Sequence, residues 1–248
     1  MKPIQLSRKS MLSRKTLLAY AKEKNEPIYG TLQRLLRSSF ITFMRGRDYA
    51  DTLVIDLGSY NRRFYPKSIN VDIFEQDTDI VTDITRTIPI ESNSVDFIAC
   101  TAVLGHVSDP KFVVSEILRI LRKGGVVWCD IPFMQPYHSA PNDFQRFTLN
   151  GIRHLFRNFE IVESGPAYPN GFAMKWILET FRNTSMINGD LPNPEYPILN
   201  SFFSPESFDK FSRELTKMDL NIVNKYGDTF PENMHEVGNA FFVYCRKK

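Results

Sequence analysis

The 248-residue sequence contains no long apolar run, and this absence excludes a protein built from membrane-spanning helices. No uninterrupted stretch approaches the roughly 20 apolar residues that such a helix needs. The N-terminus also lacks the apolar core of a secretory signal peptide. We therefore expect a cytoplasmic protein, and the balanced mixture of hydrophobic and charged residues predicts a globular fold.

Cysteine is scarce, and the three cysteines are not spaced like metal ligands or redox pairs. Cys100, Cys129 and Cys245 all fall in segments with strand character, without a C-x-x-C spacing or a neighbouring histidine pattern. We predict that these thiols are reduced and buried, and that the protein binds no metal.

The net charge is small but unevenly distributed. The whole chain carries +3, whereas residues 1–50 contain 11 Lys or Arg and 3 Asp or Glu, which gives +8, so the remainder sums to 3 − 8 = −5. Any attraction for phosphate or acidic surfaces would lie in the N-terminal arm. The sequence contains no RNA-binding motif and most of the chain is acidic, so nucleic acid is not an expected partner.

Three short apolar segments each end in a carboxylate. The first, Leu53-Val54-Ile55, runs into Asp56-Leu57-Gly58, where the glycine indicates a close backbone turn. Residues 69–73 and 79–83 repeat the arrangement. Because the carboxyl ends of parallel strands meet at one edge of a sheet, we expect these strands to bring Asp56, Asp72 and Asp83 to one ligand-binding edge.

From residue 53 to 134 the pattern alternates strand, loop and helix, which indicates a doubly wound, mainly parallel α/β sheet. Ser108-Asp109-Pro110 should begin a helix that Gly124-Gly125 ends. The final strand should pair antiparallel with the strand at 159–163. The other expected elements are strands at 95–100, 126–131 and 240–245, and a helix at 148–156.

The first 50 residues are predicted as a basic helical arm. One helix is expected within residues 1–26 and another up to Gly46, whose apolar face consists of Leu32, Leu35, Leu36, Phe40, Phe43 and Met44. We favour packing of this face on the domain's own core. A lid over the ligand, a homodimer contact and docking on an anionic membrane surface are the alternatives, and we do not favour the membrane.

The aromatic-rich stretch 165–238 is predicted as an insertion, with helices at 173–181 and from Ser204-Pro205. We accordingly expect the arm (1–50), one domain formed by 51–164 and 239–248, and this insertion within it.

As an ordered set, several motifs resemble class I S-adenosylmethionine-dependent methyltransferases. They are Asp56-Leu57-Gly58, the strand-end residues Asp72 and Asp83, Ile88-Pro89-Ile90, Ser94-Val95-Asp96-Phe97, Val103-Leu104-Gly105-His106-Val107 and Leu118 to Gly125. The resemblance covers about residues 51–164 and the last strand. It implies a Rossmann-like sheet of seven strands, the last of them antiparallel.

The resemblance also implies a donor site for S-adenosylmethionine, with S-adenosylhomocysteine as product. Gly58 would let the backbone approach the methionine part, Asp72 would bind the ribose hydroxyls, and Asp83 with Ile84 would receive the adenine. Asp56 and Thr101 complete the predicted donor residues. Asp83, which precedes Thr85, could instead cap a turn.

The segment 132–148 is similar to a loop in a branch of these enzymes found in glycan and cell-surface biosynthesis. We expect Tyr137, Asp143 and Arg146 to bind a small polar acceptor, such as a sugar, a glycan precursor or another metabolite with a hydroxyl or amine. His138, or else His106, would act as the base for in-line methyl transfer. Alternatively, His138 and Arg146 pin the loop by hydrogen bonds.

Three positions depart from the family pattern. Tyr60 and Arg62 stand where the family's first loop usually has glycines, and Gly105 replaces the acidic residue that commonly precedes the histidine. A catalytically inactive partner or scaffold subunit with this fold is therefore the rival hypothesis. A nicotinamide-dependent oxidoreductase is less consistent with the sequence, because G-x-G-x-x-G spacing is absent after Gly58.

Overall fold

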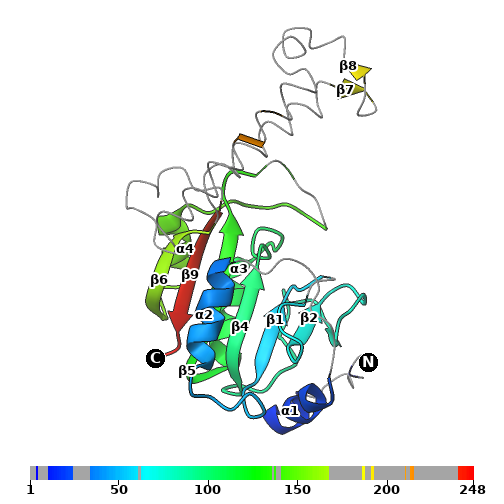
Figure 1. Ribbon diagram of the computed structural model, residues 1–248, viewed down its shortest axis with the longest axis vertical. Helices are drawn as coiled ribbons and strands as arrows, with labels where there is room; N and C mark the ends of the chain where they lie inside the picture. Colours follow the sequence, from blue (N-terminus) through cyan, green and yellow to red (C-terminus); the bar gives the residue numbers. More distant parts are fainter. Residues whose placement is uncertain are drawn as a thin grey trace.

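A seven-stranded sheet forms the centre of the computed structural model, which describes residues 4, 11–24, 34–60, 63–135, 137, 141–167, 186–187, 191–192, 210, 213–214 and 240–248. The strand order is β3-β2-β1-β4-β5-β9-β6 (Figure 1). The strands are β1 (Val54–Leu57), β2 (Ile69–Asp72), β3 (Ile80–Val81), β4 (Val95–Thr101), β5 (Leu121–Pro132), β6 (Glu160–Pro166) and β9 (Ala240–Arg246).

The last strand runs against its neighbours, as the sequence predicts. β9 pairs antiparallel with β5, where Cys129 faces Val243, and antiparallel with β6, where Ser164 also faces Val243. All other pairs in this sheet are parallel. The fold class expected from the sequence, a doubly wound sheet with an antiparallel last strand, is confirmed.

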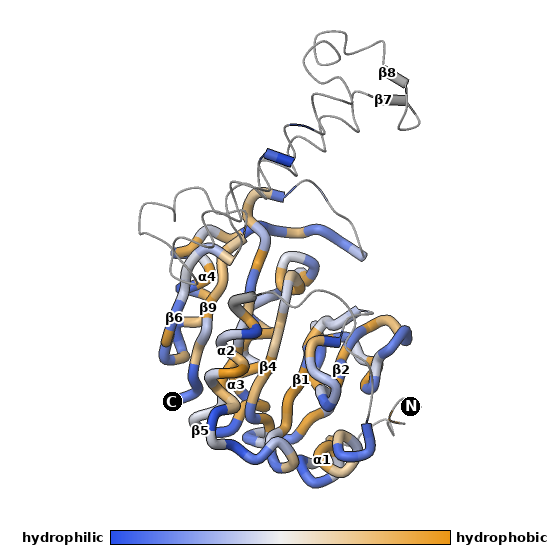
Figure 2. Tube along the Cα trace, in the orientation of Figure 1, coloured by the Kyte–Doolittle hydropathy of each residue, from blue (hydrophilic) through white to orange (hydrophobic). Residues whose placement is uncertain are grey.

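The central strands are buried because helices or loops cover both faces of the sheet. All four residues of β1 and all four of β2 are buried, and Figure 2 shows the hydropathy of these strands along the chain. Continuous burial is typical of parallel strands covered on both sides. Asp96 of β4 is a buried polar residue that has a partner there, because its carboxylate accepts a hydrogen bond from the Leu53 amide at 2.7 Å.

Helices α3 (Pro110–Ile120) and α4 (Leu149–Leu155) bury apolar residues against one face of the sheet. Asp109 caps α3 by accepting a hydrogen bond from the Phe112 amide, and Pro110 occupies its first turn, as the sequence indicates.

Helix α2 (Arg34–Met44) covers the opposite face. Phe40 packs edge-on against Phe97 of β4 and Phe64 of the β1–β2 connection. Phe43 and Met44 are buried in the same cluster. The apolar face of this helix therefore lies on the domain's own core, which was the favoured prediction for it.

The alternation of helices with strands, expected between 53 and 134, holds only for α3. The described parts of the β1–β2 and β2–β3 connections form turns. About a dozen residues are needed for a helical crossover, and residues 58–68 are too few. Helix α2, which belongs to the predicted N-terminal arm, packs on the sheet face next to this connection. It therefore supplies apolar core residues that the short connection cannot supply.

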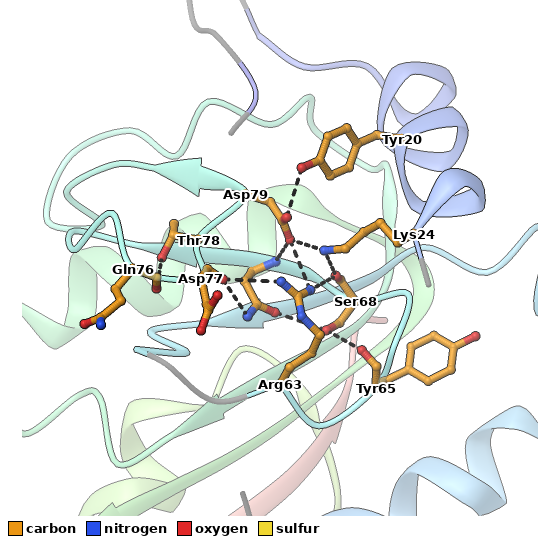
Figure 3. Close-up of polar contacts among 10 residues, drawn as sticks. Tyr20, Lys24, Arg63, Tyr65, Ser68, Gln76, Asp77, Thr78 and Asp79 are labelled. Carbon is orange, nitrogen blue, oxygen red and sulfur yellow. Dashed lines mark hydrogen bonds and ion pairs between the residues drawn. The ribbon is translucent and has the colours of Figure 1, made fainter. Parts of the chain in front are cut away.

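Helix α1 (Arg14–Glu23) lies at the end of the sheet opposite the carboxyl ends of the parallel strands. A buried polar cluster around Asp79 attaches it there (Figure 3). The carboxylate of Asp79 accepts hydrogen bonds from Lys24 Nζ, from Arg63 Nη1 at 3.3 Å and from the Tyr20 hydroxyl at 3.0 Å. Lys24 and Arg63 also donate to the Ser68 carbonyl, each at 2.8 Å. One carboxylate thus joins α1 to the chain just before β2.

One predicted boundary is wrong. Gly124-Gly125 does not end α3, which stops at Ile120, and β5 already begins at Leu121. Gly124 adopts φ +74°, and a Cβ on Gly125 would lie 2.9 Å from the Val95 carbonyl oxygen. The two glycines therefore allow an irregular strand to pass close to its neighbour.

The three cysteines are buried free thiols, as predicted. Burial raises the pKa of Cys245 to about 12. In the described part of the chain, no helix is both long and apolar enough to cross a bilayer. The predicted helices at 173–181 and from Ser204 lie largely outside the described residues. Within residues 165–238, β7 (Met186–Ile187) pairs antiparallel with β8 (Leu191–Pro192).

Candidate active site

A cavity of about 940 Å³ lies at the carboxyl ends of the central strands. Its wall includes Gly58 after β1, Asp72 at the end of β2 and Thr101 at the end of β4. The carboxyl edge of an open α/β sheet is where such folds bind their ligands. Five of the six predicted donor residues line it: Gly58, Asp72, Asp83, Ile84 and Thr101.

Gly58 must be a glycine for two independent reasons. Its φ is +73°, in the left-handed region that side chains disfavour, and a Cβ would lie 2.2 Å from Cγ2 of Val103. Its amide donates to the Val71 carbonyl oxygen at 2.7 Å. The turn after β1 is therefore held close to β2 and to the turn after β4, with bare backbone at the cavity wall.

The carboxylate of Asp72 is fixed by two main-chain amides. Oδ2 accepts from the Tyr60 amide at 2.7 Å and Oδ1 from the Phe74 amide at 3.0 Å. The residue is 6% exposed. A carboxylate has about four acceptor positions, so Asp72 retains capacity to accept two hydroxyl groups of a ligand.

Tyr60, the residue in place of a family glycine, adopts the conformation that a glycine would favour. Its φ is +52°, and its ring packs edge-on against Phe74 with the centroids 5.8 Å apart. Both residues line the cavity, and both rings are largely exposed. Tyr60 therefore keeps the backbone turn that positions Asp72.

Asp83 both lines the cavity and caps a turn. Oδ1 accepts from the Thr85 hydroxyl at 2.7 Å and from the Thr85 amide at 2.9 Å. These two hydrogen bonds hold the pKa of the Asp83 carboxyl below its ordinary value. Ile84 follows it, partly in the core and partly at the cavity wall.

His106 follows β4 and lies on the side of the cavity opposite Asp83 and Ile84. Its Nδ1 is 2.5 Å from the carbonyl oxygen of Asn142. A carbonyl oxygen can only accept, so Nδ1 carries the hydrogen and Nε2 is the basic nitrogen of the neutral ring. The histidine thereby has a defined tautomer at the cavity wall.

The loop 141–148 is bound to the turn that carries His106. The Phe144 amide donates to the Gly105 carbonyl at 2.9 Å, and Gln145 Nε2 donates to the Val107 carbonyl at 2.9 Å. A Cβ on Gly105 would lie 3.2 Å from the Gln145 carbonyl oxygen. The missing acidic residue at 105 therefore leaves room for this loop.

Residues 40–129 match a family model described as a methyltransferase domain. This segment contains Gly58, Asp72, Asp83 and His106, within a sheet whose last strand is antiparallel. Over these residues the chain is similar to methyltransferase domains. No curated protein sequence matches the chain.

Several solved structures are similar to this chain. One from Galdieria sulphuraria, a candidate sarcosine dimethylglycine methyltransferase, is 17% identical over 86% of this chain and 84% of its own, with a TM-score of 0.49. The Haemonchus contortus phosphoethanolamine N-methyltransferase 2 with S-adenosyl-L-methionine is 14% identical over 95% of this chain and 57% of its own, with a TM-score of 0.46.

The [4+2]-cyclase SpnF is 12% identical over 97% of this chain and 99% of its own, also with a TM-score of 0.46. The present chain spans little more than half of the Haemonchus chain. Identities this low carry no information about the acceptor, since one fold hosts many activities.

Four residues predicted for the site do not line the cavity. Asp56 is buried within β1, and Tyr137 is 79% exposed. Arg146 forms an ion pair with Asp143 and donates to the Gln135 carbonyl at 3.3 Å. The Asp143 carboxylate raises the pKa of Arg146. This pair holds the loop, in line with the alternative prediction for Arg146. His138 lies outside the described residues.

Sequence reasoning missed other lining residues, notably Asp130 and Asn142. Asp130 ends an apolar strand much as Asp56 and Asp72 do, and that signal could have identified it. Asn142 acts through its main-chain carbonyl, for which the sequence holds no signal. Among the described residues, no group of three or more His, Cys, Asp or Glu is arranged to hold a metal ion.

Proposed function

We propose that the cavity binds S-adenosylmethionine at the β1–β3 side, and that the protein methylates a hydroxyl or amine of a small polar acceptor. The observation that carries the proposal is the Asp72 carboxylate, fixed by two amides beside the bare backbone of Gly58. A fixed carboxylate can accept both hydroxyls of a ribose, as in dinucleotide-binding sheets.

The residues present suit the donor. Gly58 offers a close backbone approach for its amino-acid part, and Ile84, at the cavity wall beside Asp83, offers an apolar contact for adenine. When bound, the donor supplies a methyl group on positively charged sulfur. The protein's own task is then to align the acceptor with this group and to exclude water.

His106 is suited to receive the acceptor's proton. The Asn142 carbonyl sets its tautomer, so that Nε2 is the basic nitrogen. His138 remains a second candidate base. Pro141, Asn142 and Phe144 would form the acceptor wall, and their position over Gly105 suits a compact polar molecule such as a sugar or glycan precursor.

The scaffold hypothesis rests mainly on the altered glycine loop. The conformation of Tyr60 weakens that argument, because its backbone takes the left-handed turn and its amide supports Asp72. Donor binding separates the two hypotheses. Calorimetric titration with S-adenosylmethionine and S-adenosylhomocysteine should give micromolar dissociation constants, and no binding of either ligand at millimolar concentration would favour the scaffold.

The role of Asp72 is tested by Asp72→Ala. Loss of hydrogen bonds to a charged group costs roughly 1.5–3 kcal/mol each, so donor affinity should fall at least tenfold, a factor that corresponds to about 1.4 kcal/mol. Glu75→Ala is the matched control, because Glu75 is exposed in the loop just after β2. Equal donor affinity in the two variants would show that Asp72 does not bind the donor.

The role of His106 is tested by His106→Gln. This variant should bind the donor as the parent does, but transfer methyl groups more slowly. The slow rate should be independent of pH near neutrality. If His106→Gln keeps the parent rate while His138→Ala loses it, the base is His138.

A further inference from the structure

Asp130 is a buried carboxylate in the cavity wall to which neither the donor nor the base assignment gives a role. It lies near the end of β5 and is 1% exposed. The proposed donor-binding residues lie on or after β1 to β4, with Thr101 at the end of β4, and Asp130 lies on the next strand, β5. Pro132 and Ala240 line the cavity from the same side as Asp130. Asp130 therefore lies where the proposed donor side of the cavity meets the proposed acceptor wall.

The position of this carboxylate is fixed by the turn after β4. Asp130 is the register partner of Thr101, and the Ala102 amide donates to both the main-chain oxygen and Oδ1 of Asp130, each at 3.1 Å. Ala102 has φ +56°, which is unusual for a residue with a side chain. Strained backbone of this kind is typical of functional sites.

The same turn connects Asp130 with the donor site. Val103, directly after Ala102, lies so close to Gly58 that a Cβ there would overlap it. Gly58, Val103, Ala102 and Asp130 thus form a continuous series of contacts across the cavity wall. The amino-acid part of the donor is proposed to pass Gly58, so its charged sulfur would lie near this series.

The described lining residues also create a negative field. They include the carboxylates of Asp72, Asp83 and Asp130, and no lysine or arginine. Like charges repel strongly where water is scarce. Such a field favours a cationic donor and opposes an acceptor that carries a carboxylate or phosphate near the reacting atom.

We propose that Asp130 determines acceptor specificity, by presenting its carboxylate to the place where the acceptor's reacting group meets the donor. It would accept a hydrogen bond from a hydroxyl or ammonium group, and so select neutral or cationic acceptors over anionic ones. This inference rests on the proposed function of the cavity.

Sinefungin provides a probe that requires no knowledge of the acceptor. This donor analogue carries a protonated amine in place of the methylated sulfur, whereas S-adenosylhomocysteine is neutral there. Calorimetry of both ligands with the parent and with Asp130→Asn gives the ratio of their dissociation constants. Asparagine keeps an oxygen for the Ala102 amide, so the fold should persist, as circular dichroism can check.

We expect the parent to bind sinefungin at least tenfold more tightly than S-adenosylhomocysteine. Asp130→Asn should reduce this preference at least tenfold and change S-adenosylhomocysteine affinity less than threefold. Glu75→Gln is the control, since it removes an exposed carboxylate that does not line the cavity, in the loop just after β2, and should leave the preference within threefold of the parent value.

A preference that Asp130→Asn leaves within threefold of the parent value would overturn the inference. If that variant does not fold, the parent alone decides, because equal or tighter binding of S-adenosylhomocysteine than of sinefungin contradicts a carboxylate at this place. A parent that binds neither ligand would instead refute the proposed function itself.

Discussion

Asp79→Asn should destabilise the protein strongly, because Asp79 is the only carboxylate in the described cluster that faces both Lys24 and Arg63 (Figure 3). The side chains of the two cations are 0% and 5% exposed. The asparagine keeps one acceptor oxygen but removes the negative charge. Two cations would then remain buried beside each other without the carboxylate.

The size of the effect follows from this burial. Removing one partner from a buried ion pair costs roughly 3–5 kcal/mol, a large share of a total stability of about 5–15 kcal/mol. For a chain of about this length, each kcal/mol shifts the melting temperature by roughly 2–4 °C. We therefore expect the melting temperature to fall by about 6–20 °C.

Urea unfolding followed by circular dichroism measures the effect, with Asp77→Asn as the matched control. Asp77 lies two residues away, and its side chain is exposed, while its main-chain carbonyl accepts from Arg63 and Asn70. The control changes the same charge and should stay within about 0.5 kcal/mol of the parent, as exposed substitutions usually do.

Adding Lys24→Met to Asp79→Asn should recover part of the loss, because it removes one of the two uncompensated cations. If Asp79→Asn and Asp77→Asn unfold at the same urea concentration with the same slope, the cluster does not stabilise the fold as argued.

Three further predictions follow from single sites. Burial alone would raise the pKa of Glu116, but hydrogen bonds from Arg119 and the Ile88 amide outweigh it and lower that pKa. A lowered carboxyl pKa stabilises the fold above the ordinary value of 4.5 and ceases to do so as pH falls through the folded-state value. Glu116→Gln should therefore be less stable than the parent at pH 7, by about 1–3 kcal/mol, and urea titrations should show the gap closing below pH 4.5. Gly58→Ala should weaken S-adenosylhomocysteine binding in calorimetry at least tenfold, because its Cβ would displace Val103; unchanged affinity would contradict the close approach. Iodoacetamide at pH 8 should modify none of the three thiols in the folded protein and all of them in urea, as counted by mass spectrometry; they are Cys100, Cys129 and Cys245.

The sheet could be predicted from the sequence because each strand has a local signal. β1 and β4 are apolar runs that end in polar or glycine residues, and β9 is rich in β-formers at the end of the printed sequence. The Asp109-Pro110 cap likewise identified the start of α3. These signals depend on neighbouring residues alone, so no knowledge of the tertiary structure is needed.

Contacts between distant segments could not be predicted in this way. From the sequence, the apolar face of α2 could pack on the domain's own core, on the ligand as a lid, on a second copy of the chain or on a membrane. Only its packing on Phe97 in the structure decides between these alternatives. Gly124-Gly125 looked like a helix end, yet its role depends on β4 and on Lys247, whose main chain bonds both glycines. Local propensity could not reveal either partner.

Two of the three departures from the family pattern, Tyr60 and Gly105, have one feature in common: each is explained by main chain rather than by a side chain. The Tyr60 amide supports Asp72, and the bare Cα of Gly105 admits the loop whose Asn142 carbonyl orients His106. A side chain at 105 would bring its Cβ to 3.2 Å from the Gln145 carbonyl oxygen, so the loop would have to shift by a few tenths of an ångström. Under the proposed function, the glycine at 105 therefore accompanies a closely docked acceptor wall, and the unusual motif indicates a changed acceptor site rather than a lost donor site.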